Sequence, residues 1–220
     1  MKIEDVIKKI KKELETRFKS EYSGHDIYHL QRVLGLALNI QKKEGGDKLV
    51  IAVASFLHDI HRIIETETGK FCLPKDSLTV IRKILEKINL PEEKVKNILH
   101  CIEFHEEYGF SKKGKTVKDI ETLILEDADN LDAIGAIGIA RGFMFGGANN
   151  IPMWRPEISF RRKYFEESKN DVSEIHHFYS KLLKLKHNMN TKTGRKIAEK
   201  RHEFIERFLK EFFNEWKGRV

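Results

Sequence analysis

The sequence predicts an all-α fold made of a single domain, and three observations lead to this class. Apolar residues recur three or four positions apart along almost the whole chain, which is helical spacing. No stretch of useful length alternates apolar and polar residues as a half-buried strand would. The chain has 220 residues, four prolines and no Ser/Gly-rich tract, so we expect one domain, 1–220, without a flexible linker.

The first two predicted helices are separated by a break. IEDVIKKIKKELETRF, 3–18, repeats apolar residues on one helical face. SGHD, 23–26, then reads as a break and a helix cap. The second helix follows and carries His29 on its apolar face. It is expected to stop at the glycine pair 45–46, a common C-terminal signal.

Three further helices are predicted in the middle of the chain. The uncharged run LVIAVASFL, 49–57, is the most apolar segment and reads as a buried helix. A polar connection, ETETGKFCLP at 65–74, leads to a fourth helix at about 76–89. A proline suited to a first helical turn opens the fifth, which runs over about 91–107.

The last third of the chain is expected to hold a long helical stretch, a long loop and two closing helices. TVKDIETLILEDADNLDAIGAIGIARGF, 116–143, reads as one long helix or two abutting ones. The segment at about 146–171 has no period and reads as a loop. Helices are expected from 172 to about 187 and from about 192 to 216.

Composition and charge limit the classes of function. No uncharged apolar stretch reaches the roughly 18 residues that a membrane span needs, and the charged N-terminus has no signal-peptide pattern. Cys72 and Cys101 have no metal-type spacing, so reduced thiols in a cytoplasmic protein are the plain interpretation. The net charge of +7 favours phosphorylated ligands. A solvated lysine-rich surface explains the same charge.

Two His-Asp dipeptides stand in different settings. Asp26 is placed at a helix start, where its carboxylate can accept hydrogen bonds from free N–H groups as a cap. Asp59 follows the apolar run, near the negative end of a helix dipole, and no Lys or Arg lies in the preceding two turns. Because a buried unpaired carboxylate is costly, a cation is expected beside it. A divalent metal fits, with His58 as a neutral nitrogen ligand.

Further ligands are expected from two other segments. His29 points inward with the apolar residues of its helix, although a lone inward histidine is more often a hydrogen-bonded core residue. The acidic run EDADNLD places Asp127, Asp129 and Asp132 at the head of an otherwise apolar segment, with Asp129 on the apolar stripe. Two histidines and two carboxylates suit Mn, Fe, Co, Ni, Zn or Mg and leave positions open for water.

Several strings of the sequence together resemble one known superfamily. The strings are GHDIYHLQRV, ASFLHDI, DADNLDAIGAIGIAR, HFYSKLLKLKHNMNTKT and AEKRHEFIERFL, which between them span most of the chain. The chain thus resembles the HD superfamily of metal-dependent phosphohydrolases, and most closely its small nucleotide pyrophosphohydrolase-like branch. The resemblance implies an enzyme with a bound divalent metal that hydrolyses phosphate or pyrophosphate bonds of nucleotides such as (d)NTPs.

Carried over by position, the resemblance assigns four metal ligands. The first metal histidine falls on His29 and not on His25, the adjacent pair falls on His58 and Asp59, and the distal carboxylate falls on Asp129. These are the residues that the burial argument selects.

The residues after the second His-Asp pair depart from the superfamily pattern. A small or acidic residue is common there, whereas this chain has His61 and Arg62. Arg62 is expected to bind phosphate, and the proton handler would then come from elsewhere, with Asp132 and Asp127 as candidates. His105 is a further candidate for the proton handler. His100 and His105 are also candidates for ligands of a second metal. Alternatively, His105 and Glu106 form an exposed helix end.

Basic residues in the matching strings are candidates for substrate binding, namely Arg141, His177 and Lys181. Helix packing is the alternative role for Arg141 and for Tyr179. The loop PMWRPEISFRRKYF, with Arg155, Arg161, Arg162 and Lys163, reads either as a lid over the site or as a solvated connection.

Two other functions remain open from the sequence. A di-iron HD oxygenase would need additional His or Asp ligands. A helical nucleic-acid-binding module with a structural metal would show salt-dependent affinity for DNA and no phosphate release. A small phosphorylated molecule is the expected partner, with neither a membrane nor nucleic acid, and the oligomeric state is not determined by the sequence.

Overall fold

The computed structural model describes residues 2–14, 17–18, 23–110, 116–160 and 171–219. Within these ranges the chain is helical and contains no strand, which confirms the predicted fold class. The elements are α1 (Ile3–Leu14), α2 (Ile27–Glu44), α3 (Lys48–Leu57), α4 (Ile60–Thr68), the 3₁₀ turn η1 (Pro74–Ser77), α5 (Leu78–Ile88), α6 (Glu92–Phe104), α7 (Ile120–Asp132), α8 (Gly135–Ala148), α9 (Glu174–His177), the π-helical turn η2 (Phe178–Leu182), α10 (Leu183–Asn188) and α11 (Lys192–Trp216).

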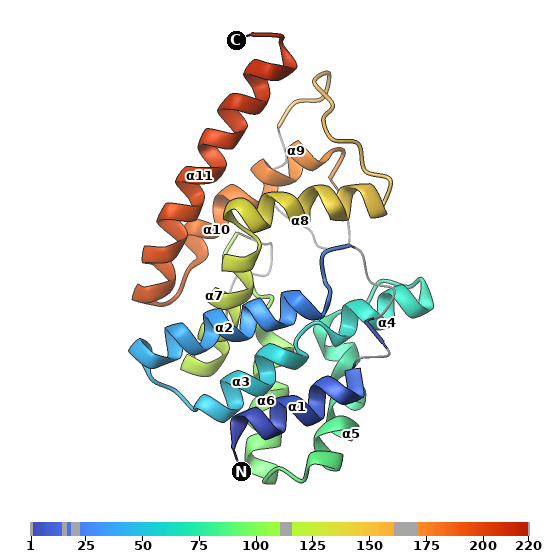
Figure 1. The fold of residues 1–220 in the computed structure, drawn as a ribbon, viewed down its shortest axis with the longest axis vertical. Helices are drawn as coiled ribbons and strands as arrows, with labels where there is room; N and C mark the ends of the chain where they lie inside the picture. Colours follow the sequence, from blue (N-terminus) through green and yellow to red (C-terminus); the bar gives the residue numbers. More distant parts are fainter. Residues whose placement is uncertain (1, 15–16, 19–22, 111–115, 161–170, 220) are drawn as a thin grey trace.

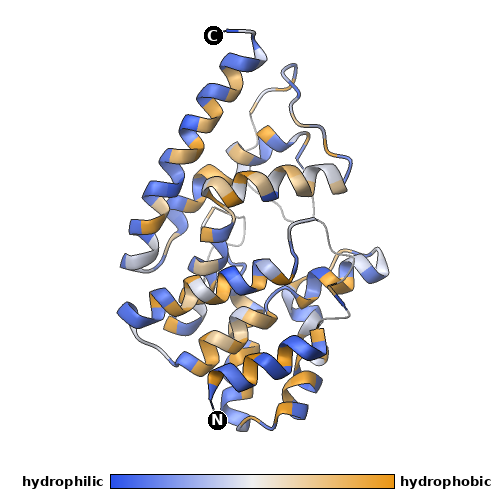
Figure 2. Cartoon of the chain, viewed as in Figure 1, coloured by the Kyte–Doolittle hydropathy of each residue, from blue (hydrophilic) through white to orange (hydrophobic). Residues whose placement is uncertain are grey.

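The helices pack in two groups. Helices α1 to α6 form one half of the molecule and α8 to α11 the other, with α7 passing between them, and the two termini lie at opposite ends (Figure 1). Apolar residues face inward along most of the helices and polar residues face outward (Figure 2).

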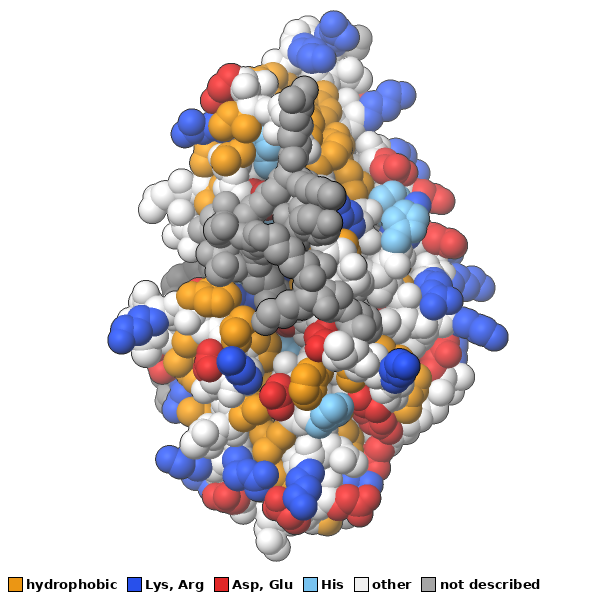
Figure 3. Space-filling view, turned by 180° about the vertical axis from the view of Figure 1, so that it is seen from behind, with side chains coloured by type: hydrophobic (Ala, Val, Ile, Leu, Met, Phe, Trp, Pro, Cys, Tyr) orange, Lys and Arg blue, Asp and Glu red, His pale blue; other side chains and the backbone are white. Residues whose placement is uncertain are grey.

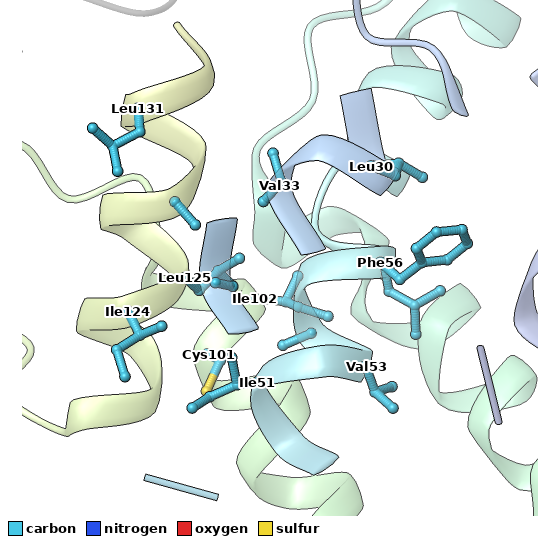
Figure 4. Packing of buried hydrophobic residues seen from close by; sticks show 14 of the residues in the cluster. Leu30, Val33, Ile51, Val53, Phe56, Cys101, Ile102, Ile124, Leu125 and Leu131 are labelled. Carbon is cyan, nitrogen blue, oxygen red and sulfur yellow. The ribbon is translucent and has the colours of Figure 1, made fainter. Parts of the chain in front are cut away.

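The apolar run of the sequence forms the centre of the first half. In α3, every residue from Val50 to Leu57 is buried. Val33 of α2, Ile51 of α3, Ile102 of α6 and Leu125 of α7 belong to one buried apolar cluster (Figure 4). Because α3 is enclosed by these three helices, the residues that end it are held in the interior.

A sharp bend divides the segment that the sequence left as one or two helices. Helices α7 and α8 meet at 74°, and the bend depends on two glycines. Gly135 has a φ of +79°, which a side chain disfavours, and a Cβ on Gly138 would lie 2.3 Å from the backbone of Ala133. No single helix in the described ranges is long and apolar enough to cross a membrane, and only this bent pair passes that test.

Several predicted boundaries are wrong. Helix α4 begins one residue after Asp59 and extends to Thr68, so it includes the start of the polar connection predicted at 65–74. The first helix ends at Leu14 and not at 18. Helix α8 extends to Ala148, so the irregular segment begins after it, and 161–170 lie outside the described residues. The predicted helix at 172–187 is divided into α9, η2 and α10.

The surface and the cysteines agree with the sequence. Lys and Arg side chains alternate with acidic ones on the described part of the face in Figure 3 and form no single basic patch there. Cys72 and Cys101 are both free and buried.

Asp127 fastens the start of α11, and replacing it is expected to destabilise the fold without affecting a metal. Its carboxylate accepts hydrogen bonds from the backbone N–H and side-chain amide of Asn190 (2.7 and 2.9 Å) and from the backbone N–H and hydroxyl of Thr191 (2.8 and 2.7 Å). Because Asp127→Ala leaves these donors without their acceptor, we expect the free energy of unfolding to fall by about 2–4 kcal/mol in urea titrations.

A matched control is Asp119→Ala, which removes the side-chain cap of α7 and is expected to cost about 1 kcal/mol. If Asp127→Ala instead lowers metal content at unchanged stability, the structural role is wrong.

Candidate metal centre

His58 and Asp59 occupy the junction between two helices. Helix α3 ends at Leu57 and α4 begins at Ile60, and both intervening side chains are buried, at 0% and 2% exposed. Asp59 also precedes α4 at its N-terminus, which the sequence interpretation missed, but its side chain makes no cap hydrogen bond there. Its carboxylate therefore remains available to other partners.

Four predicted ligands converge at this junction. His29 Nε2 lies 3.1 Å from Asp59 Oδ2, 3.5 Å from Asp129 Oδ1 and 3.2 Å from His58 Nε2. His58 Nε2 lies 3.6 Å from a carboxylate oxygen of Asp59 and 3.6 Å from one of Asp129. The ligands come from α2, the α3–α4 junction and α7, far apart in the sequence.

The second ring nitrogen of each histidine fixes its tautomer. His58 Nδ1 lies 3.0 Å from the backbone oxygen of Ser55, which can only accept, so Nδ1 carries the proton. His29 Nδ1 lies 2.8 Å from Asp132 Oδ2 and donates to it in the same way. In the neutral rings both Nε2 atoms therefore present lone pairs to each other and to two carboxylates.

This arrangement fits a divalent metal. Four electron-pair donors face one another within 3.1–3.6 Å with no hydrogen-bond donor between them in the neutral state of the rings. Ligands that each lie about 2.0–2.2 Å from one metal ion would be separated by similar distances. Histidine ligands whose other nitrogen is held by a carboxylate or carbonyl are typical of metal sites. His29, His58 and Asp129 form one of the described clusters able to hold an ion.

The carboxylates of Asp59 and Asp129 shift the pKa values of the groups around them. Burial alone would lower the pKa of His58, but the carboxylates of Asp59 and Asp129 outweigh it and raise the pKa to about 9. Burial would raise the pKa of Asp59, but the neighbouring His58 and His25 hold it well below the usual range. The two carboxylates therefore favour a positive charge at this position.

His25 lies beside the centre, which the sequence did not predict. Its Nδ1 is 2.7 Å from Asp59 Oδ2, and it can also join His29 and Asp59 in a metal-binding cluster. Asp26 has the predicted capping role, since its carboxylate accepts a hydrogen bond from the N–H of His29 at 2.8 Å.

Asp132 lies behind His29. Besides the bond to His29, it accepts hydrogen bonds from Arg32 Nε at 2.8 Å and from Arg141 at 3.1 Å. Burial would raise the pKa of Asp132, but these partners lower it to about 2. The carboxylate thus orients His29 and links Arg141 to the centre, so we assign it a positioning role.

A second group of possible ligands adjoins Asp59. His61 Nε2 lies 3.5 Å from Glu106 Oε1, and these two residues can hold an ion together with Asp59. His61 Nε2 and His105 Nε2 are buried and have no hydrogen-bond partner among the described residues. His105 is only 1% exposed and the Glu106 side chain 8%, so the interpretation as an exposed helix end is wrong.

One cavity opens beside the converging ligands, and the predicted catalytic and substrate residues line it with the exception of Asp132. Its volume is about 150 Å³, whereas a single water molecule needs about 10–15 Å³. Arg62, Arg141, His177 and Lys181 all line it, together with Asp59, Asp129, His25 and Glu106 and with Glu174, which the sequence analysis missed. His100 does not line this cavity, because it is exposed and lies 3.0 Å from Asp119.

The side chains near the cavity are themselves tied in pairs. Arg62 donates to Glu106 at 3.0 Å and lies 3.4 Å from Glu65, and His177 lies 3.1 Å from Asp171. The ammonium of Lys181 lies 4.7 Å from the ring centre of Tyr108. Arg62 of α4, Arg141 of α8 and Lys181 of η2 thus bring cationic groups from three separate segments to the same cavity.

The structure describes part of the predicted lid. Arg155 is exposed and lies 3.8 Å from Glu157, while Arg161, Arg162 and Lys163 lie outside the described residues. The ring of Tyr179 contacts that of Phe160 at 4.1 Å, which agrees with a packing role.

Comparison with known proteins connects this site to one family. The HD domain family model matches residues 26–134, which include all four converging ligands. The chain is 34% identical to the protein YpgQ of Bacillus subtilis (strain 168) over 201 residues, or 90% of this chain and 87% of that protein.

Solved structures show the same likeness. A crystal structure of an HD-superfamily hydrolase from Bacillus thuringiensis has a TM-score of 0.69 and 35% identity, covering 98% of this chain and 96% of that one. The crystal structure of B. subtilis YpgQ in complex with ADP has a TM-score of 0.71 and 27% identity, covering 98% of this chain and 97% of that one. With its ligands gathered at the His58-Asp59 junction, the chain belongs to the HD domain family and has the fold of the HD-superfamily hydrolases.

Proposed function

We propose that the protein is a metal-dependent phosphohydrolase that cleaves phosphate or pyrophosphate bonds of nucleotides. The observation that carries this proposal is the convergence of His29, His58, Asp59 and Asp129 beside a cavity that is also lined by cationic side chains. Mn, Fe, Co, Ni, Zn and Mg all suit this set of nitrogen and oxygen donors.

The chain's own residues have distinct tasks in such a reaction. A bound divalent metal would lower the pKa of water and polarise the phosphoryl oxygen. Asp132 and the backbone oxygen of Ser55 hold the two histidine rings in position. Arg62, Arg141 and Lys181 line the cavity, where their positive charges favour a polyphosphate and would stabilise the negative charge that develops in the transition state.

The nucleotide part of the proposal has separate support. YpgQ, whose fold this chain shares over nearly its whole length, was crystallised with ADP. A nucleoside diphosphate combines an anionic part suited to the basic residues with a base suited to the apolar part of the same cavity, formed by Phe145, Ile151 and Leu182.

The decisive experiment measures phosphate and pyrophosphate release from all common ribo- and deoxyribonucleotides with each candidate metal in turn. Release of pyrophosphate or phosphate that requires a metal and is inhibited by EDTA is expected. If no nucleotide is hydrolysed with any metal while the protein binds metal stoichiometrically, the proposed reaction is wrong.

A second candidate is the di-iron oxygenase, which is favoured by the adjoining group of His61, Glu106 and Asp59. It requires two irons per chain and consumption of oxygen. Elemental analysis after purification from iron-supplemented culture distinguishes the two functions, because a hydrolase of the proposed kind does not depend on redox-active iron.

Arg62→Ala is expected to lower kcat by roughly 10- to 1,000-fold at unchanged metal content. The reason is that Arg62 reaches the cavity without being one of the four converging ligands. The kcat of Arg62→Lys should lie between that of the wild type and that of Arg62→Ala, since lysine keeps the positive charge but lacks the paired N–H donors of arginine.

The role of Arg62 is tested by measuring kcat in steady-state kinetics and metal content by elemental analysis on the same preparations. Arg82→Ala is the matched control, because Arg82 also pairs with a glutamate at 3.0 Å but does not line the cavity. An Arg62→Ala enzyme with wild-type kcat would show that the residue serves only to hold Glu65 and Glu106.

A further inference from the structure

The wall of the cavity formed by α8 and α9 differs chemically from the wall that carries the metal ligands. Much of it consists of small and apolar residues, although Arg141 of α8 and His177 of α9 also line it. Glu174, the first residue of α9, is the acid within these two helices that lines the cavity. Helices α8 and α9 lie side by side, in the half of the molecule away from α3 and α4 (Figure 1). The apolar and small members of this wall are Gly138, Gly142, Phe145, Ile151 and Leu182.

Glu174 is held in this wall with one of its carboxyl oxygens unpartnered among the described residues. The residue is 2% exposed, and its Oε1 atom has no hydrogen-bond partner among the described residues. Two glycines of α8 make the space it occupies. A Cβ on Gly142 would lie 2.6 Å from Oε1, and one on Gly146 would lie 3.1 Å from Oε2.

The surroundings favour the neutral form of this carboxyl. Burial, and then the negative charge of Asp171, raise the pKa of Glu174 to about 8. The described residues form no ion pair with it that would oppose this effect. A neutral carboxyl can donate one hydrogen bond and accept another, whereas a carboxylate only accepts.

We propose that Glu174 is a specificity-determining residue that hydrogen-bonds the amino edge of the nucleobase, with adenine as the fitting class. Adenine presents a ring nitrogen that accepts beside an amino group that donates, which matches the donor and acceptor of a neutral carboxyl. The apolar side chains of the same wall suit the faces of the base. This inference rests on the proposed function for its ligand class, and the ADP complex of YpgQ agrees with it.

The test compares binding of two nucleotide analogues that differ in one group. The probes are the α,β-methylene forms of ADP and of purine riboside 5′-diphosphate, which lacks the 6-amino group, titrated calorimetrically into Mn²⁺-loaded protein. Methylenediphosphonate, which has no nucleoside, reports on the metal side alone. Because these probes resist hydrolysis, binding is measured whether or not the protein is an enzyme.

Glu174→Leu is expected to weaken binding of the ADP analogue by about 10- to 100-fold. It should weaken the purine analogue much less and leave methylenediphosphonate unchanged. Glu174→Gln keeps one donor and one acceptor and should bind the ADP analogue within about 3-fold of wild type. Gly142→Ala, whose Cβ would displace Oε1, should reproduce the Glu174→Leu result.

Equal weakening of all three probes by Glu174→Leu would overturn the inference, because it would indicate a general structural effect. Wild-type affinity of Glu174→Leu for the ADP analogue, or no binding of that analogue by the wild-type protein, would overturn it as well. If binding shows the expected dependence on Glu174 but no nucleotide is hydrolysed, base recognition stands and only the proposed reaction fails.

Discussion

Asp59→Ala is expected to abolish metal binding and to lower kcat/KM by at least about 1,000-fold. The Asp59 carboxylate lies close to three histidines, since its oxygens are 3.1 Å from His29, 3.6 Å from His58 and 2.7 Å from His25. Without it the histidines lose the negative charge that allows them to retain a dication in a buried site. Elemental analysis and the nucleotide assay on the same preparation measure both effects.

Asp26→Ala is the matched control, since it removes a carboxylate from the first of the two His-Asp pairs. Asp26 caps α2 through the N–H of His29, so the change is expected to cost on the order of 1 kcal/mol of stability. Metal content should remain at about one equivalent. If Asp59→Ala retains metal and Asp26→Ala loses it, the centre is built on the other pair.

The convergence of His29, His58, Asp59 and Asp129 could be predicted because each is a polar side chain within an apolar stretch of sequence. Asp59 ends an apolar run, and a carboxylate buried by such a run needs a compensating cation. Helix α3 is indeed enclosed by α2, α6 and α7. His29 and Asp129 could be identified for the same reason, as polar groups on apolar faces. Helix types and most helix positions followed from the spacing of apolar residues, and α11 was predicted at its observed bounds.

The remaining parts of the site depend on tertiary contacts that leave no local pattern. His25 reads as part of a turn, and only the packing of that turn against the α3–α4 junction brings it to Asp59. Glu106 follows the end of α6 and would be exposed if α4 did not place Arg62 and His61 beside it. Glu174 stands in a polar stretch, and its burial arises from Gly142 on a different helix.

The spacing of apolar residues in α6 indicates that Glu106 lies near the core. His105 lies three and seven residues after Ile102 and Ile98, on the buried face of α6. The apolar period therefore continues through the histidine and places its neighbour at the edge of the core. This spacing indicates burial of His105, which the structure shows, and not an exposed helix end.

His29→Ala is expected to remove the metal and the activity together, whereas His25→Ala should leave metal content unchanged. His25 precedes the N-cap of α2 and His29 lies within its first turn, yet both have a ring nitrogen near Asp59 Oδ2, at 3.1 Å for His29 and 2.7 Å for His25. Only His29 also approaches His58 and Asp129, and only its ring is completely buried, with the far nitrogen fixed by Asp132. The His25 ring is 23% exposed and faces the cavity.

Metal content by elemental analysis and turnover in the nucleotide panel distinguish the two histidines, with circular dichroism as the check that each variant is folded. Asp132→Asn serves as an intermediate case. It keeps a group of the same shape behind His29 but removes the charge that holds the ring, so metal affinity should fall by about 10- to 100-fold. If His25→Ala loses the metal and His29→Ala keeps it, Asp59 binds the ion through the cluster at the cavity side, and the assignment of His29 is wrong.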